Sequence, residues 1–388
     1  MCYADDTLLV ARADTFGEAR LRAEVGVTFL IRAIERLGLR VSVAKPEAVA
    51  FSVEGTPAGA VTGIGGAVVP IGSAVKYLGL TLDSRWNFRD HFRLLLPKAW
   101  GMAMALARLT ANIGGPAERR RRLYATTVMS VVLYGAPIWA QTVASDRGIL
   151  RDVRRLQRQL ALRIIRGYRT VSHEAASVLS GMVPFDIVAN RLRRSYLRRR
   201  DVIRRSGTIE PRMTLMLTEV ERRRSILRWR ERMIELPPDR PGAIVRGAFV
   251  EDLENWVGRA HGDLTYRITQ VLTGHGVIES YLYRIGWRES PICLFCRAAV
   301  DTAAHTLLFC PAWVEQRRGL LEHVGVCRTL RAVVRAIVRS SDAWSIFAEF
   351  CEVVMRRKEE DERARERGLG PPGGPLVPLP NVHSSDEE

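Results

Sequence analysis

The sequence predicts an α+β protein in which short strands and hairpins come first and a long helical part follows. Up to about residue 90, short apolar runs alternate with turns rich in glycine and proline, as strands do. From about residue 91 onward, apolar residues recur at helical spacing over most of the chain. A cluster of cysteines and a histidine near residue 300 adds a small metal-bound module to this scheme.

The chain opens on Tyr3-Ala4-Asp5-Asp6, an acidic pair between the apolar runs Met1–Ala4 and Thr7–Val10. We interpret the two runs as strands joined by a tight turn that carries both carboxylates. Neighbouring carboxylates repel each other, so this placement favours a site for a divalent cation, and hard oxygen ligands are what Mg²⁺ prefers. The alternative from these residues alone is a solvated acidic turn.

A helix and a lysine-bearing strand are expected next. Apolar residues at helical spacing over residues 17–39 predict a helix that stops at Gly38. The segment Leu39–Glu47 predicts a strand that delivers Lys45 into a turn. Lys45 is one of four lysines among 59 lysines and arginines, so a basic position without a specific role would more often be arginine. The alternative is a surface charge before Pro46.

A glycine-rich stretch from Gly63 to Gly72 precedes the segment Val75–Asp83. This segment predicts a hairpin whose second strand is apolar and whose Gly79 permits a close backbone approach.

Two helices are then predicted within residues 92–145. The first has an apolar pattern and stops at Gly114-Gly115-Pro116. The second carries Tyr134 and runs into Gly135-Ala136-Pro137-Ile138-Trp139, where we expect the aromatic residues of the segment to pack in the core at a helix end. The apolar positions are Leu94, Leu95, Ala99, Met102, Leu106 and Leu109 in the first helix and Leu123, Val128, Val131 and Val132 in the second.

The formal net charge of +17 is concentrated in one region. Between Glu118 and Arg232 there are 27 arginines against 10 acidic residues, a difference that equals the whole excess. Such arginines neutralise phosphates and release counterions, which favours nucleic-acid binding over the alternative of solvated helix surfaces. One helix shows this clearly, because Ile149, Val153, Leu156, Leu160 and Ile164 form an apolar stripe and arginines occupy its other positions. The candidate contact residues are Arg119, Arg120, Arg121, Arg122, Arg154, Arg155, Arg198, Arg199 and Arg200.

The most specific local motif is C-x2-C-x8-H-x4-C, formed by Cys293, Cys296, His305 and Cys310. Two cysteines at this spacing form a tight thiolate turn, and a following histidine and cysteine close a tetrahedral Cys₃His site. A site with four protein ligands has no open position, so we expect structural Zn²⁺. The alternative is reduced cysteines in an apolar core.

Other features exclude several classes of protein. No apolar run is long enough to span a bilayer, and no secretory signal precedes the first motif. Six cysteines, three of them clustered, do not suggest a disulfide framework, so we expect a soluble intracellular protein. The segment after Arg356 becomes charged and then rich in glycine and proline, and we expect it to be disordered.

In their order along the chain, these motifs resemble the C-terminal part of the reverse transcriptases of non-LTR (LINE-type) retrotransposons. The similar segments are the Y-x-D-D box with its A-D-D-T-L-L wording, Tyr77-Leu78-Gly79, the Y-G-x-P-x-W segment at 134–139, and the segments 270–276, 281–282, 301–305 and 310–313 around the cysteines. The resemblance runs from Cys2 to about Leu320. It is strongest to the arthropod, jockey-like clade that inserts into ribosomal RNA genes.

The resemblance implies an RNA-directed DNA polymerase used in target-primed reverse transcription. Its partners would be an RNA template, a DNA target that serves as primer, and deoxynucleoside triphosphates, in the nucleus and without a membrane. Asp5 and Asp6 would bind Mg²⁺, Tyr3 would lie beside the primer end, and Lys45 would lie near the incoming nucleotide. Tyr77, Leu78 and Gly79 would form the primer grip, and Cys293, Cys296, His305 and Cys310 a zinc knuckle that contacts nucleic acid.

The same resemblance implies a division of the chain. It comprises part of a palm with the primer grip (1–90), a helical thumb (91–170), an arginine-rich helical connecting region (171–285), the zinc-knuckle region (286–335), and a helix followed by a disordered tail (336–388). Two-metal transfer needs a further carboxylate, and the fingers and endonuclease of the family have no counterpart in this sequence. We therefore expect a fragment that does not polymerise alone. The alternative is a non-catalytic RNA- or DNA-binding protein with a vestigial acidic pair.

Overall fold

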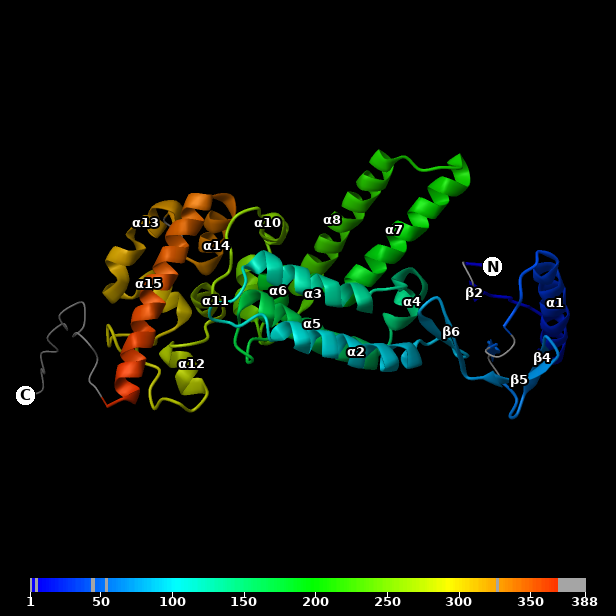
Figure 1. The fold of residues 1–388 in the computed structure, drawn as a ribbon. Coiled ribbons are helices and arrows are strands. Elements are labelled where there is room, and N and C mark those ends of the chain that lie inside the picture. The colour runs from blue at the N-terminus through cyan, green and yellow to red at the C-terminus, as the bar shows by residue number, and fades with distance from the viewer. Residues whose placement is uncertain (1, 4–5, 43–45, 53–54, 326–327, 369–388) are drawn as a thin grey trace, which may run out of the picture.

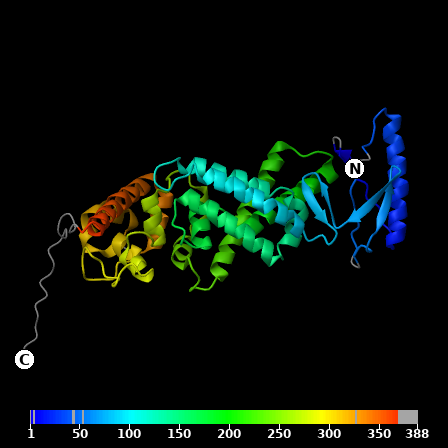
Figure 2. The same cartoon turned by 60° about the horizontal axis from the view of Figure 1, so that its bottom comes forward.

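The computed structural model describes residues 2–3, 6–42, 46–52, 55–325 and 328–368. Both views of the ribbon show an elongated molecule with three parts in chain order (Figures 1 and 2). The strands and the first helix lie at one end, a set of long helices forms the middle, and shorter helices with one long C-terminal helix form the other end.

The acidic hairpin is present but is shorter than predicted. Strand β1 (Cys2–Tyr3) pairs antiparallel with β2 (Asp6–Thr7), and Tyr3 lies opposite Asp6. Asp6 is therefore part of a strand and not of the turn, and Leu8–Val10 form no strand, which corrects the prediction.

Helix α1 (Phe16–Arg36) confirms the predicted helix with nearly the expected bounds. Its N-cap residue Thr15 accepts a hydrogen bond from the Glu18 backbone N–H, and Gly38 follows with φ +80°. No side chain of α1 is buried. The Glu24 carboxylate joins the helix to strand β4 by accepting from the Gly63 N–H at 2.9 Å.

The predicted strand over Leu39–Glu47 is wrong for the residues that are described. Residues 39–42 and 46–47 have no regular structure, and a strand begins only at β3 (Ala48–Val49). Pro46 lacks an N–H and cannot donate to a ladder, which explains why pairing starts after it. β3 pairs in parallel with β5 (Ala67–Gly72), which pairs antiparallel with β4 (Val61–Ile64).

The predicted hairpin at 75–83 is confirmed. Strands β6 (Ala74–Tyr77) and β7 (Leu80–Asp83) pair antiparallel around a two-residue turn. Both turn residues have positive φ, +45° at Leu78 and +80° at Gly79, which is the geometry of a type I′ turn. β6 and β7 form a separate two-stranded sheet, so the strands do not join into one continuous sheet.

The middle part begins with helices α2 (Arg89–Ala107), α3 (Glu118–Val132), α4 (Ala136–Val143), α5 (Arg147–Ile165) and α6 (His173–Ser180). The apolar stripe predicted for α5 is fully buried. The predicted core packing of the aromatic residues at 134–139 is confirmed for Trp139 but wrong for Tyr134, which is 55% exposed. The stripe predicted for α2 is wrong in part, because Leu94 and Leu109 are exposed while His91, Phe92 and Ala103 face the core. In α3, Leu123 is also exposed.

Helices α7 (Phe185–Ser206) and α8 (Pro211–Glu235) form a long antiparallel hairpin. Figure 1 shows it extending away from the other helices of the middle part. Its base packs on α4, where Phe185 stacks on Trp139 at 5.5 Å between ring centroids. An ion pair between Arg232 and Asp186 closes the base at 2.5 Å.

The C-terminal part contains helices α9 (Ala243–Phe249), α10 (Leu253–Gly258), α11 (Tyr266–Thr273), α12 (Glu279–Arg284), α13 (Val314–Val324) and α14 (Leu330–Arg339). The long helix α15 (Ser341–Glu366) packs against α11, α13 and α14. We expected disorder after Arg356, and for 357–366 this is wrong, because Lys358 and Asp361 are buried. Residues 369–388 lie outside the described residues.

One apolar cluster runs through the middle and C-terminal parts, from Leu80 to Met355. Within the described residues before β7, no side chain belongs to this cluster, so the first part of the chain is held to the rest mainly through the β6–β7 hairpin. No single described helix is long and apolar enough to cross a membrane. Among the described helices, α3 and α4 taken together have the length and composition of a span, but an 81° bend separates them.

Candidate metal centre and nucleic-acid-binding surface

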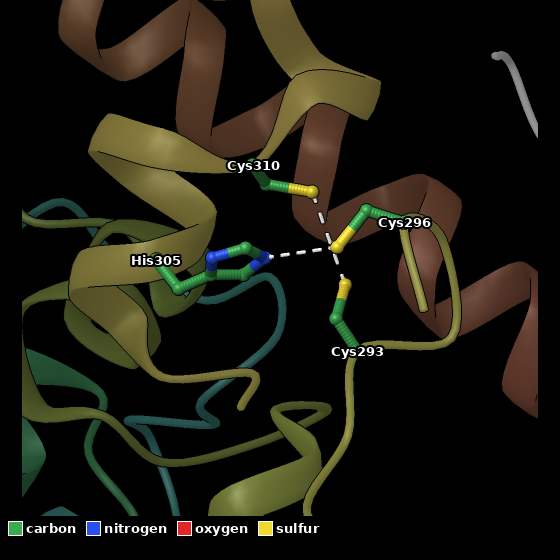
Figure 3. A group of neighbouring side chains, drawn as sticks. All are labelled: Cys293, Cys296, His305 and Cys310. Atoms are coloured by element: carbon green, nitrogen blue, oxygen red, sulfur yellow. Dashed lines mark hydrogen bonds between the residues drawn. The ribbon is translucent and has the colours of Figure 1, made fainter. Parts of the chain in front are cut away.

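Cys293, Cys296, His305 and Cys310 come together at one point, as the motif predicts. Their four potential ligand atoms all lie within 4.8 Å of one another, and Figure 3 shows the side chains converging from two segments of the chain. Cys293 and Cys310 are fully buried, and Cys296 and His305 are each 9% exposed. Within the part of the chain that the structure describes, this is the one group of three or more potential metal ligands.

Local backbone geometry builds the centre. The Cys293 N–H donates to the Ala299 carbonyl at 2.8 Å, and the Arg297 N–H donates back to the Cys293 carbonyl at 2.8 Å, which folds the first two cysteines into a tight turn. Arg297 takes a left-handed conformation with φ +57° to close it. His305 begins a π-helical turn, η1 (His305–Phe309), and Cys310 follows its end, where the Cys310 N–H donates to the His305 carbonyl at 2.7 Å.

The distances fit a tetrahedral ion. A Zn–S bond of about 2.3 Å and a Zn–N bond of about 2.0 Å imply tetrahedral edges of about 3.8 Å between two sulfurs and about 3.5 Å between sulfur and nitrogen. The Cys293 and Cys310 Sγ atoms are 3.8 Å apart, and Cys296 Sγ lies 3.4 Å from His305 Nε2. The hydrogen bond from Cys310 lowers the pKa of the Cys293 thiol and raises that of Cys310, so Cys293 is the sulfur of this pair that loses its proton more easily.

Buried charged side chains hold the metal-ligand segments in place through hydrogen bonds and an ion pair. Arg317, which is buried, donates to the carbonyls of Cys310 and Thr306. Asp301, four residues before His305, accepts from the Thr306 hydroxyl at 2.7 Å and forms an ion pair with Lys358 of α15 at 2.5 Å. Both charged side chains of this pair are nearly inaccessible, so α15 is fixed directly to the metal-ligand loops.

The acidic pair is only partly placed by the structure. Asp6 lies exposed on β2. Asp5 and Lys45 lie outside the described residues, and nothing is assigned to the side chain of Tyr3. Among the described residues, no group of three or more potential metal ligands includes Asp6.

The Tyr77-Leu78-Gly79 segment forms the tip of the β6–β7 hairpin, and it is held by a contact that the sequence did not reveal. The Tyr134 hydroxyl donates to the Leu78 carbonyl at 2.9 Å, and its ring lies so close to Gly79 that an added Cβ would be 3.3 Å away. Next to it, a Cβ on Gly135 would lie 2.7 Å from the Leu80 side chain. These contacts join the hairpin to the α3–α4 junction.

A buried carboxylate fixes the other end of the same hairpin. Asp83 accepts backbone N–H bonds from Arg85, Asn87 and Phe88 at 2.6 to 3.2 Å, in the turn that leads into α2. The hairpin is therefore attached to the helices of the middle part at both its tip and its base.

The candidate arginines fall into three groups. Arg119, Arg120, Arg154, Arg155 and Arg200 are exposed, in positions that a phosphate can reach. Arg121 is buried and donates to five backbone carbonyls, so its assignment to a nucleic-acid surface is wrong. The remaining three already have protein partners, namely Glu118 and the Ser180 carbonyl for Arg122, Glu221 for Arg198, and Thr218 for Arg199.

Comparison with known proteins identifies the relatives of this chain. It is 24% identical over 388 residues to the "Retrovirus-related Pol polyprotein from type-1 retrotransposable element R1 4" of Nasonia vitripennis. This match covers 93% of the chain and 96% of that protein. It is 27% identical over 378 residues to the "Putative 115 kDa protein in type-1 retrotransposable element R1DM" of Drosophila melanogaster. The chain is a homologue of the R1 Pol polyproteins. No protein-family model and no solved structure matches it.

The R1 homology confirms the family that the motifs indicated. The match to the Drosophila protein covers 92% of the chain but 35% of that protein, and a Pol polyprotein of Bradysia coprophila is matched over 66% of the chain and 25% of its own length. The chain thus spans about a third or less of these two relatives. The similarity to the Drosophila protein covers 92% of the chain, so it extends over the strand-bearing part, the long helices and the metal-ligand segment together.

Proposed function

We propose that this R1 homologue works as the primer-holding and nucleic-acid-binding part of an RNA-directed DNA polymerase. In this proposal residues 1–90 belong to the palm, the β6–β7 hairpin is the primer grip, and residues 91–170 form the thumb. The substrates are an RNA template, a DNA primer and deoxynucleoside triphosphates, and the site of action is chromosomal DNA in the nucleus. The relationship to R1 Pol polyproteins over more than nine-tenths of the chain carries the proposal.

The structure supports this role through the way the hairpin is held. A grip must present its turn at a fixed position, because a displacement of about 1 Å is enough to slow a reaction strongly. Here Tyr134 and Gly135 hold the tip of the hairpin and Asp83 holds its base. We assign Asp5 and Asp6 to Mg²⁺, which would activate the primer hydroxyl and stabilise charge on the triphosphate when bound.

We assign Zn²⁺ to the Cys₃His centre as a structural ion. All four ligands come from the protein, so no position is open for a substrate. The ion would hold the 293–310 loops against α15 and so complete the C-terminal part.

The test is nucleic-acid binding and primer extension by the 388-residue chain. Fluorescence anisotropy on a labelled RNA–DNA hybrid is expected to show tight binding that weakens steeply with salt, because arginines displace counterions. We expect no Mg²⁺-dependent extension, since a two-metal site needs a further carboxylate beyond Asp5 and Asp6. The double variant Asp5→Asn, Asp6→Asn is the control and should bind as wild type does.

Two results would contradict the proposal. Binding that is absent at low salt would remove the nucleic-acid role. Mg²⁺-dependent extension by the wild-type chain would contradict the expectation that it does not polymerise alone, and extension that persists in the Asp5→Asn, Asp6→Asn variant would show that the acidic pair is not the metal site.

A further inference from the structure

We propose that the outer part of the α7–α8 hairpin binds an unpaired nucleic-acid strand. We call residues 193–224 the arm. This inference rests on the proposed function and adds to it the element that makes the contact and the form of nucleic acid that it takes.

The position of the arm makes its side chains available. Figure 1 shows the hairpin extending away from the body; at its base Phe185 stacks on Trp139 of α4, and at the inner end of the arm Arg223 lies 4.0 Å from Glu254 of α10. Along the arm the two helices contact each other. Arg194 and Arg198 both pair with Glu221, at 2.6 and 3.0 Å, and the Glu221 side chain is fully buried between the helices. These two ion pairs join α7 to α8 along the arm and leave the outer faces of the helices exposed to solvent.

The arm carries a strong positive charge that its own acids do not neutralise. It has 11 arginines against 4 acidic residues, a net charge of +7 within 32 residues. Three of these acids already pair with arginines of the arm. Glu221 pairs with Arg194 and Arg198, Asp201 with Arg204 and Arg205, and Glu219 with Arg222 and Arg223. Within the described structure no hydrogen bond or ion pair is made by the side chains of Arg193, Arg200, Arg212 and Arg224.

These free arginines are spaced for a strand of phosphates. Arg193 and Arg200 are seven residues apart, so they lie on the same side of α7 about 10 Å apart along its axis. That distance matches about three nucleotides of a strand whose bases are stacked, at the duplex-like rise of about 3.4 Å per nucleotide. Arginine is also the cation that best pairs with a phosphate through two parallel N–H donors.

Exposed apolar side chains lie between the arginines. Tyr196 is 48% exposed and sits between Arg193 and Arg200 on α7, and Leu215 and Met216 are 71% and 57% exposed near the start of α8. A duplex hides the faces of its bases and would press these apolar groups against hydrated phosphates. An unpaired strand offers base faces that stack on tyrosine and cover the aliphatic groups while its phosphates meet the arginines. The combination therefore favours a single strand.

The experiment uses the full chain and fluorescence anisotropy with two probes, a labelled oligo-uridine RNA and a labelled RNA–DNA duplex of the same length. The arm variant carries Arg193→Ala, Arg200→Ala and Arg212→Ala. Its control carries Arg318→Ala, Arg328→Ala and Arg339→Ala, which remove the same charge from exposed positions of the C-terminal part. A thermal melt of each variant confirms the fold.

For the arm variant we expect the slope of log affinity against log salt on oligo-uridine to fall by about 2, since each lost phosphate contact on a single strand contributes about 0.7. The control should keep the wild-type slope. Tyr196→Ala should weaken oligo-uridine binding by about 5- to 100-fold and duplex binding much less, because one stacked base is lost. Tyr196→Phe should restore most of the affinity.

The inference is overturned if the arm variant and its control behave alike, or if Tyr196→Ala weakens duplex and single strand equally. It is also overturned if the arm variant and Tyr196→Ala both bind oligo-uridine as the wild-type chain does. Failure of the wild-type chain to bind any nucleic acid would instead reject the proposed function as a whole.

Discussion

Arg121 is the buried member of a run of four arginines at the start of α3. Its guanidinium donates to carbonyls of the preceding loop and to the Arg163 carbonyl at the end of α5. Burial, followed by repulsion from Arg166 and Arg163, lowers its pKa to about 10, so it remains a cation at neutral pH. Four consecutive helical residues point around the whole helix, so one of them must face inward, and the sequence does not say which.

We expect Arg121→Met to lower the free energy of unfolding by about 3 kcal/mol or more, because several buried carbonyls lose their donor at once. Arg120→Met is the matched control, since Arg120 is the exposed neighbour. It should change stability by less than about 0.5 kcal/mol while reducing the salt dependence of nucleic-acid binding. Urea denaturation and anisotropy measure the two effects. Equal stability losses in the two variants would contradict the structural role of Arg121.

Asp146 gives a pH-dependent prediction at the same scale. Its carboxylate caps α5 by accepting from the Gly148 and Ile149 N–H groups and pairs with Arg89 at 2.8 Å. The backbone bond from Ile149, followed by the bond from Arg89, holds the pKa of Asp146 below its usual range. A depressed pKa means that the carboxylate stabilises the fold at pH values above the unfolded pKa, about 3.9, and that this is lost as pH falls through the folded pKa.

Asp146→Ala should therefore cost about 1 kcal/mol at pH 6, as the loss of an N-cap does. The difference from wild type should shrink as the pH is lowered below about 4. Denaturation curves for both proteins across this range provide the measurement. A difference that stays constant down to pH 2 would show that the carboxylate charge is not involved.

At the scale of elements, the junction between the β6–β7 hairpin and α3–α4 is the feature with the clearest consequence. Leu78 holds a positive φ that costs a non-glycine residue energy, and the bond from Tyr134 to its carbonyl helps to keep it there. Gly135 also has positive φ, +68°, and has no room for a Cβ beside Leu80. Tyr134 acts on the hairpin through a hydrogen bond and Gly135 through its close approach to Leu80, so separate substitutions can test the two contacts.

We expect Tyr134→Phe to lower the free energy of unfolding by about 1 kcal/mol, the value of one hydrogen bond. Gly135→Ala should cost more, because it adds backbone strain to a clash with Leu80. Amide hydrogen exchange should report faster opening of residues 74–83 in both variants while α5 stays protected. Gly101→Ala is a suitable control, since a Cβ there meets nothing within 4 Å. Unchanged exchange in the hairpin would reject the junction.

Elements could be predicted from the sequence where the information is local. The stripe on α5 has its apolar residues on one face, and all five are buried as predicted. The metal centre follows from a spacing within eighteen residues. Helix α2 has leucines on several faces, so its buried side was assigned incorrectly. The contact of Tyr134 with Leu78 joins residues 56 positions apart, which no local pattern could reveal.

At the scale of the whole molecule, the metal centre and α15 form one unit. Besides the Asp301–Lys358 pair, Arg267 of α11 pairs with Glu352 and Glu359 of α15 at 2.8 and 2.7 Å. These partners lie about 60 to 90 residues apart, so no local sequence pattern indicates that they pair. Without that information, the charged composition after Arg356 suggested disorder instead of packing. A buried ion pair such as Asp301–Lys358 is costly when one partner moves away, so the position of Asp301 matters for all of α15.

Metal removal should therefore disturb much more than the ligand loops. We expect about one Zn²⁺ per chain by mass spectrometry, and loss of it on chelation should expose α11 to α15 to hydrogen exchange while α2 to α5 keep their protection. Cys310→Ser should reproduce the effect, because it removes a ligand. Cys351→Ser is the matched control: Cys351 is a buried cysteine of α15 outside the ligand group, so this variant should lose stability only through packing and should retain its zinc. Exchange confined to residues 293–310 after chelation would contradict this coupling, because the buried pair between Asp301 and Lys358 would then have held α15 in place without the ion.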